Sequence, residues 1–177
     1  MFHAKNYIKV TSLEEAYELN QKKSNAIIGG MLWLKMGNRN MQTAIDLSGL
    51  GLDQIEEQED AFSIGCMCTL RQLEMHEALN LYFGGAMKAC TRHIVGTQFR
   101  NGATVGGSIF GRFGFSDILT CLLALDTYVE LYHAGVIALS EFVEMPRDND
   151  ILVRIIIKKM AERLHIGHTV RRRRISR

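Results

Sequence analysis

The stretch NGATVGGSIFGRFGFSDILTCLLALD, residues 101–126, decides the fold of this chain. Five glycines come before an apolar, helix-compatible run that begins at Ile118. Glycine is used where the backbone takes a positive φ or approaches another group closely, and such backbone can present N–H groups to an anion such as phosphate. Ser116 or Asp117 is placed to cap the helix. Two interpretations stay open: a phosphate-binding loop packed on a buried helix, or a glycine-rich connection between a strand and a helix.

Composition indicates one compact domain, or two small lobes that share an interface. The chain has 177 residues, 47% hydrophobic and 23% charged, with a net charge of +2. This charge does not indicate a polyanionic partner. No apolar run approaches the roughly 18 to 20 residues that cross a bilayer, and residues 1–10 lack the apolar core of a signal peptide. We therefore expect a cytoplasmic protein without a membrane partner.

The cysteines and histidines do not form a metal-binding pattern. Cys66 and Cys68 are spaced C-x-C, which is not a usual zinc or iron–sulfur spacing. Cys90 and Cys121 stand in apolar surroundings. We expect four reduced, mostly buried thiols, no metal site and no catalytic side chain.

Residues 160–177 form a basic tail that contains the run Arg171–Arg174. The tail is either a solvated, frayed end or an arm that binds nucleic acid. Because no aromatic residues are interleaved with the arginines, we expect no nucleic-acid partner.

Local patterns predict a small parallel layer in the first part of the chain. Ser12 opens a capping-box pattern, and a strand–helix–strand order over so short a span favours parallel strands. The predicted strands are residues 7–10, 25–28 and 43–47, and the helical segments are 13–21 and 31–36. The polar, acidic segment 49–60 is the predicted boundary between two lobes.

The second part is predicted to combine helices with antiparallel strands. Thr69 opens another capping-box pattern, and Gly84-Gly85 interrupts a helical pattern over residues 79–94. The predicted strands are residues 61–66, 127–132, 135–138 and the β-branched run 151–157.

Two glycine pairs are the candidate ligand loops. Gly29-Gly30 follows the apolar run 26–28, and Gly106-Gly107 follows the strand-like run 103–105. Neither pair matches the G-x-G-x-x-G or Walker pattern, so the ordinary dinucleotide fold is not indicated. Two separated backbone loops, one from each lobe, would suit a pyrophosphate held at their interface.

These loops resemble those of a known family. Residues 26–30, AIIGG, followed by an apolar helix, resemble the first flavin loop of the FAD-binding subunits of molybdenum hydroxylases, the xanthine dehydrogenase and carbon monoxide dehydrogenase family. Residues 101–109, NGATVGGSI, resemble the family's second loop, which usually reads close to N-x-A-T-I-G-G-N-I. Residues 116–119 and 122–126 match the helix that follows. The resemblance covers roughly residues 1–159.

The resemblance implies an α+β, two-lobed FAD-binding fold of the PCMH (vanillyl-alcohol-oxidase-like) type. A small N-terminal parallel layer, residues 1–55, would face a larger, mainly antiparallel sheet with helices, residues 56–159. FAD would lie between the lobes with its pyrophosphate on the two loops. The cofactor-binding residues implied by position are Ile28, Gly29, Gly30, Met31, Leu32, Trp33, Leu34, Ile94, Thr104, Gly106, Gly107, Ser108, Asp117 and Leu152.

The same resemblance implies an electron-transfer function. Electrons would pass from iron–sulfur clusters on a partner subunit to FAD and then to NAD or another acceptor, while a molybdenum-cofactor subunit hydroxylates the substrate. The alternative is an assembly module of such a complex that no longer retains flavin.

The sequence also departs from the family. Met31 stands where the family commonly has a polar residue, and Ser108 replaces an asparagine. We also expect the chain to lack the family's further C-terminal domain. Two roles stay open. Trp33 is either a core or lobe-interface aromatic or a flavin-stacking residue, and Arg112 either pairs with phosphate or is a loop cation.

Overall fold

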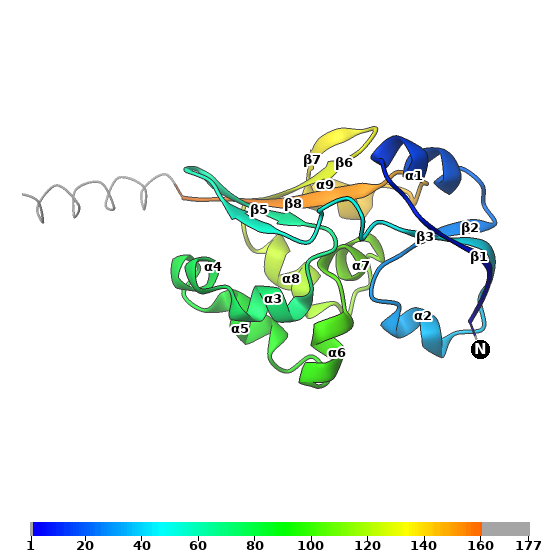
Figure 1. The fold of residues 1–177 in the computed structure, drawn as a ribbon. Helices are drawn as coiled ribbons and strands as arrows, with labels where there is room; N and C mark the ends of the chain where they lie inside the picture. The colour runs from blue at the N-terminus through cyan, green and yellow to red at the C-terminus, as the bar shows by residue number, and fades with distance from the viewer. Residues whose placement is uncertain (1, 161–177) are drawn as a thin grey trace, which may run out of the picture.

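A computed structural model describes residues 2–160 of the chain (Figure 1). The basic run Arg171–Arg174 lies outside the described residues. The described chain forms two lobes, each built on its own sheet. This two-lobed α+β arrangement confirms the fold class that the sequence indicated.

The first lobe is a three-stranded parallel sheet with the order β1-β3-β2. Figure 1 shows its two helices on opposite sides of the sheet, because the two right-handed crossovers run in opposite directions across it. In chain order, the elements are β1 (His3–Lys9), α1 (Leu13–Asn20), β2 (Asn25–Ile28), α2 (Leu32–Met36) and β3 (Asn40–Asp46). As predicted, Ser12 caps α1, and its hydroxyl accepts a hydrogen bond from the Glu15 amide.

The second lobe is a five-stranded antiparallel sheet with the order β4-β5-β8-β6-β7. The helices α3 to α8 lie along one face of this sheet (Figure 1). In chain order, the elements are β4 (Ile55–Glu57), β5 (Ala61–Gly65), α3 (Leu70–Met75), α4 (Glu77–Tyr82), α5 (Ala86–Thr91), α6 (Thr97–Gly102), α7 (Val105–Phe110), α8 (Asp117–Leu123), β6 (Thr127–Leu131), β7 (Gly135–Ala138), α9 (Leu139–Glu144) and β8 (Leu152–Lys158).

The main core lies between this sheet and its helices. Phe62 on β5, Ile155 on β8 and Ile118 and Leu122 on α8 are fully buried there. Burying such side chains stabilises the fold by roughly 1.5 to 3 kcal/mol each. The core therefore fixes α7 and α8, the two helices that carry the second glycine loop and the segment after it.

The structure contradicts one local prediction and contains one strand that the sequence did not predict. The strand-like run 103–105 is not a strand: Thr104 forms only an isolated bridge with Thr69, and Val105 already begins α7. The segment 49–60 contains β4, whose only apolar residue is Ile55. By contrast, Gly84-Gly85 separates α4 from α5 as predicted, and both glycines have positive φ.

Candidate functional site

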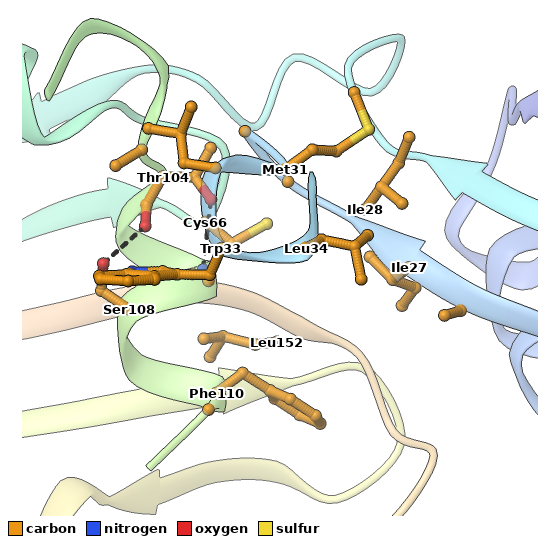
Figure 2. Close-up of a pocket in the computed structure, with 18 of the residues that line it drawn as sticks. Ile27, Ile28, Met31, Trp33, Leu34, Cys66, Thr104, Ser108, Phe110 and Leu152 are labelled. Atoms are coloured by element: carbon orange, nitrogen blue, oxygen red, sulfur yellow. Dashed lines mark hydrogen bonds between the residues drawn. The ribbon is translucent and has the colours of Figure 1, made fainter. Parts of the chain in front are cut away.

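A cleft of about 990 Å³ lies between the two lobes. Figure 2 shows residues from both lobes that line it, among them Met31 and Trp33 from the first and Thr104, Ser108 and Leu152 from the second. All fourteen residues that the resemblance implied line this one cleft. They are Ile28, Gly29, Gly30, Met31, Leu32, Trp33, Leu34, Ile94, Thr104, Gly106, Gly107, Ser108, Asp117 and Leu152.

The first wall of the cleft presents unpaired backbone donors. Within residues 2–160, the amides of Gly29, Gly30 and Met31 donate no hydrogen bond to a protein acceptor. Met31 has a φ of 58°, the left-handed region that a non-glycine residue rarely adopts. The segment therefore leaves the sheet in a turn that exposes consecutive N–H groups, an arrangement suited to an anion.

The glycines of the first pair are required by close approach to the second lobe. A Cβ atom on Gly30 would lie 1.5 Å from the carbonyl oxygen of Gly102, and one on Gly29 would lie 2.4 Å from Oγ1 of Thr104. At Gly30, no other residue type fits without moving the two backbones apart, whereas at Gly29 the Thr104 side chain would have to move. The first loop therefore lies directly against the second.

The second loop is hydrogen-bonded within its own lobe. The Val105 amide donates to the carbonyl of Cys68 and the Gly106 amide to that of Cys66, both at 2.8 Å. The Gly107 amide donates to Oγ1 of Thr104 at 3.2 Å. The expectation that both glycine pairs offer unpaired amides is therefore wrong for the second pair, because these bonds hold its backbone against residues 66–70.

What the second loop offers instead is open space and hydroxyl groups. Gly107 is exposed, and, apart from the backbone of its own helix, the only atom of residues 2–160 within 4 Å of a Cβ added there is Oγ1 of Thr104, at 3.1 Å. Ser108, one residue further on, donates its hydroxyl to the carbonyl of Thr104 at 3.0 Å (Figure 2). A ligand can therefore approach the backbone of α7 where any other residue would project a side chain.

The cleft is also lined by three cationic residues that were not predicted from the sequence: Lys23, Arg39 and Arg147. Within residues 2–160, neither Lys23 nor Arg39 forms an ion pair. The sequence could have indicated this positive surface, because no acidic residue occurs between Glu18 and Asp46. The first lobe therefore presents a positive side to the cleft.

Two acidic residues of the cleft, Asp150 and Asp117, lie in different environments. The carboxylate of Asp150 is buried and accepts hydrogen bonds from the backbone amides of His133, Ala134 and Ile151, so its charge is compensated inside its own loop. Asp117 is exposed at the first position of α8, while Ser116 is the residue that caps this helix. Asp117 is therefore free to accept hydrogen bonds from a ligand hydroxyl or amino group.

Apart from Asp148, the remaining lining is apolar or neutral. Leu152 and Ile118 are buried, and Phe110 is partly buried. Burial raises the pKa of the Cys66 thiol to about 12, so this sulfur stays protonated at neutral pH. The cleft therefore combines an apolar floor with cationic and hydrogen-bonding walls, the usual makeup of a cofactor site.

The structure also separates the two roles left open for Arg112. Arg112 does not line the cleft. Its guanidinium lies 4.0 Å from the centre of the Phe142 ring and donates to the carbonyl of Met145 at 3.2 Å. Arg112 is thus a loop cation that packs on an aromatic ring.

Residues 2–160 match the family described as FAD binding domain in molybdopterin dehydrogenase. The chain belongs to this family. FAD is accordingly the cofactor of this domain, and the molybdenum hydroxylase resemblance is confirmed.

Relatives of this FAD-binding domain have low sequence identity and closely similar folds. The uncharacterized protein YgfM of Escherichia coli (strain K12) is 26% identical over 156 residues, which are 86% of this chain and 58% of YgfM. A carbon monoxide dehydrogenase chain from Hydrogenophaga pseudoflava superposes with a TM-score of 0.79 at 20% identity, over 88% of this chain and 59% of that one.

Quinoline 2-oxidoreductase from Pseudomonas putida 86 gives a TM-score of 0.80 at 19% identity, over 91% of this chain and 61% of that one. The chain thus spans about three fifths of the length of these relatives. Among the described residues, no helix is both long and apolar enough to cross a membrane.

The cleft residues fit FAD. The unpaired amides of Gly29, Gly30 and Met31 suit an anion such as the pyrophosphate, and the cationic Lys23 and Arg39 line the same cleft. The volume of about 990 Å³ lies at the upper end of the ~300–1,000 Å³ typical of ligand pockets, as a dinucleotide requires.

Proposed function

We propose that this chain is an FAD-binding electron-transfer subunit of a molybdenum-containing hydroxylase. In this proposal it receives electrons from iron–sulfur clusters on a partner subunit and passes them to NAD or another acceptor in the cytoplasm. A second partner carries the molybdenum cofactor and hydroxylates the substrate. The observation that carries the proposal is the single cleft on which both glycine loops converge, in a chain whose residues 2–160 match the FAD-binding family.

The chain's own residues have binding and positioning roles in this proposal. The amides of Gly29, Gly30 and Met31 hold the pyrophosphate, and the open face at Gly107 admits it against α7. Leu152 and Ile94 provide apolar surface near the ring and exclude water from it. FAD supplies the redox chemistry when it is bound, so no acid, base or nucleophile from the protein is required.

The proposal assigns the iron–sulfur clusters to another chain. Within residues 2–160, no group of three or more cysteine, histidine, aspartate or glutamate side chains could hold a metal ion. The buried Cys66 and Cys68 lie beside the second loop, and Cys90 and Cys121 contact each other between α5 and α8. Neither pair supplies the four thiolates that a cluster requires.

A flavin-release assay tests the proposal. The chain is purified, incubated with excess FAD, freed of unbound cofactor and denatured, and the flavin in the supernatant is quantified. We expect close to one FAD per chain, and reduction of the bound flavin when the iron–sulfur subunit, the molybdenum-cofactor subunit and the substrate are added together. A folded chain that retains no FAD would contradict the proposal and favour an assembly module instead.

A further inference from the structure

The single tryptophan of the chain is exposed inside the cleft. Trp33 lies on α2, lines the cleft and keeps 57% of its surface accessible (Figure 2). It is therefore not a core residue, whereas its contacts with the second lobe confirm the lobe-interface alternative. Tryptophan is largely buried in most proteins. A solvent-exposed indole in a ligand cleft therefore suggests that a bound ligand covers it.

The indole meets two aromatic rings at steep angles and still keeps more than half of its surface accessible. Its ring centre lies 5.6 Å from that of Phe99 at 70°, and 6.1 Å from that of Phe115 at 67°. Both contacts have edge-to-face geometry, and within residues 2–160 no aromatic ring stacks parallel to the indole. Both partners belong to the second lobe, so the orientation of Trp33 depends on the lobes being together.

Further contacts hold Phe115, one of the two rings beside Trp33, in place. Phe115 stacks on Phe113 with ring centres 5.2 Å apart and 15° between the planes. The guanidinium of Arg147 lies 5.6 Å from the centre of the Phe113 ring, and it also donates a hydrogen bond to the carbonyl of Gly111. These contacts fix the 111–116 loop, so Trp33 meets a pre-formed surface and loses little conformational freedom when a ligand binds.

The neighbouring backbone indicates the chemistry of the missing partner. Trp33 comes three residues after Gly30 and two after Met31, whose amides are unpaired in the described chain. One short segment therefore offers donors for an anion and a flat π surface for a ring. A ligand that satisfies both has a phosphate and a planar heteroaromatic ring, as a nucleotide has.

We propose that Trp33 stacks on a planar ring of the bound dinucleotide, either the flavin or the adenine. The inference rests on the proposed function and adds to it a specificity residue that binds the ring. Since α2 has no buried residue of its own, the stacked ring also fastens this helix to the second lobe. Trp33 thus links cofactor binding to the contact between the lobes.

Titrations with FAD, FMN and ADP test this assignment. Trp33→Ala should weaken FAD binding roughly 5- to 150-fold, the range typical of a lost base–aromatic stack, and Trp33→Phe should restore part of the affinity. If the flavin is the stacked ring, FMN binding weakens in parallel and the fluorescence of bound flavin rises, because contact with indole quenches it. If the adenine is stacked, ADP binding weakens, and ADP changes the tryptophan emission of the wild-type protein.

Met36→Ala is the matched control, because Met36 lies on the same helix, is more exposed than Trp33 and does not line the cleft. It should leave all three affinities unchanged. The inference is overturned if Trp33→Ala and Trp33→Phe bind FAD, FMN and ADP as the wild type does. Should Trp33→Ala fail to fold, unchanged flavin fluorescence in Trp33→Phe together with no emission response to ADP overturns it equally. A wild-type chain that binds no FAD would instead refute the proposed function itself.

Discussion

Gly30 of the first lobe and Gly102 of the second lobe meet backbone to backbone. A Cβ atom on Gly30 would lie 1.5 Å from the carbonyl oxygen of Gly102, far inside van der Waals contact. Gly102 ends α6, and Thr104, two residues later, caps α7. This contact therefore sets the distance between the two loops that border the cleft.

Gly30→Ala should destabilise the protein because neither backbone can move without separating the lobes. Overpacking of this kind costs about 3 kcal/mol, and we expect a corresponding loss of FAD binding. Urea unfolding followed by circular dichroism measures the change. Gly114→Ala is the control, since no atom lies within 4 Å of a Cβ added there. Equal unfolding midpoints for the two variants would show that the lobes are not in contact at Gly30.

Gly107→Val separates binding from folding. Outside the backbone of its own helix, a Cβ atom at this exposed position would meet only Oγ1 of Thr104 among the described residues, and Gly107 lines the cleft. We expect a folded chain whose FAD affinity falls at least about tenfold, or about 1.4 kcal/mol. Calorimetric titration measures this affinity. The FAD affinity of Gly107→Ala should lie between those of the wild type and Gly107→Val. A folded valine variant with unchanged affinity would remove the second loop from the site.

The buried ion pair between Glu74 and Arg100 positions the second loop. Nε of Arg100 donates to Oε2 of Glu74 at 2.8 Å, and both side chains are buried. Arg100 lies on α6 just before Gly102, so the pair ties α6 to α3. Arg100→Met should cost about 3 kcal/mol of unfolding free energy, because it leaves a buried carboxylate with only Arg71 as a partner. A loss below about 0.5 kcal/mol, the range of ordinary surface substitutions, would contradict this role.

The same pair should make stability depend on pH. The hydrogen bond from Arg100 lowers the pKa of Glu74 below its ordinary value, although burial opposes this shift. A lowered folded-state pKa stabilises the protein above the unfolded-state pKa of about 4.3, and this stabilisation is lost as pH falls through the folded-state value. Wild-type protein should therefore lose stability more steeply below about pH 4.3 than Glu74→Gln does. Parallel stability curves from pH 7 to 3 would refute the prediction.

Lys23 and Arg39 should contribute to binding through charge. Each lines the cleft without an ion-pair partner in the described chain. Lys23→Gln and Arg39→Gln should each weaken FAD and ADP binding roughly two- to fivefold at low salt, and the difference should shrink as salt screens the charge. Lys35→Gln, on α2 and outside the cleft lining, is the control. Equal affinities for all three variants would exclude a specific role for the two cations.

The two lobes could be predicted from sequence because their signals are local. The caps at Ser12 and Thr69 and the apolar strands are readable in a few residues. The error at residues 103–105 arose because tertiary hydrogen bonds to Cys66 and Cys68 decide that backbone. β4 was not predicted because its sequence, Ile55 followed by Glu56 and Glu57, has no apolar alternation that would indicate pairing with β5.

The candidate site was predictable only in part, for a similar reason. The glycine pairs have a recognisable sequence pattern, and the structure brings them to one cleft. Lys23, Arg39 and Phe115 join that cleft only when the lobes meet, and no spacing in the sequence relates them. The exposure of Trp33 likewise depends on the angle at which α2 faces the second lobe.

A crystal structure of the chain grown with excess FAD tests the central claim most directly. We predict electron density for the pyrophosphate within hydrogen-bonding distance of the amides of Gly29 and Gly30, with Gly107 and Ser108 on its other side. FAD bound elsewhere on the protein, or a cleft in which these four residues make no contact with the cofactor, would contradict the account.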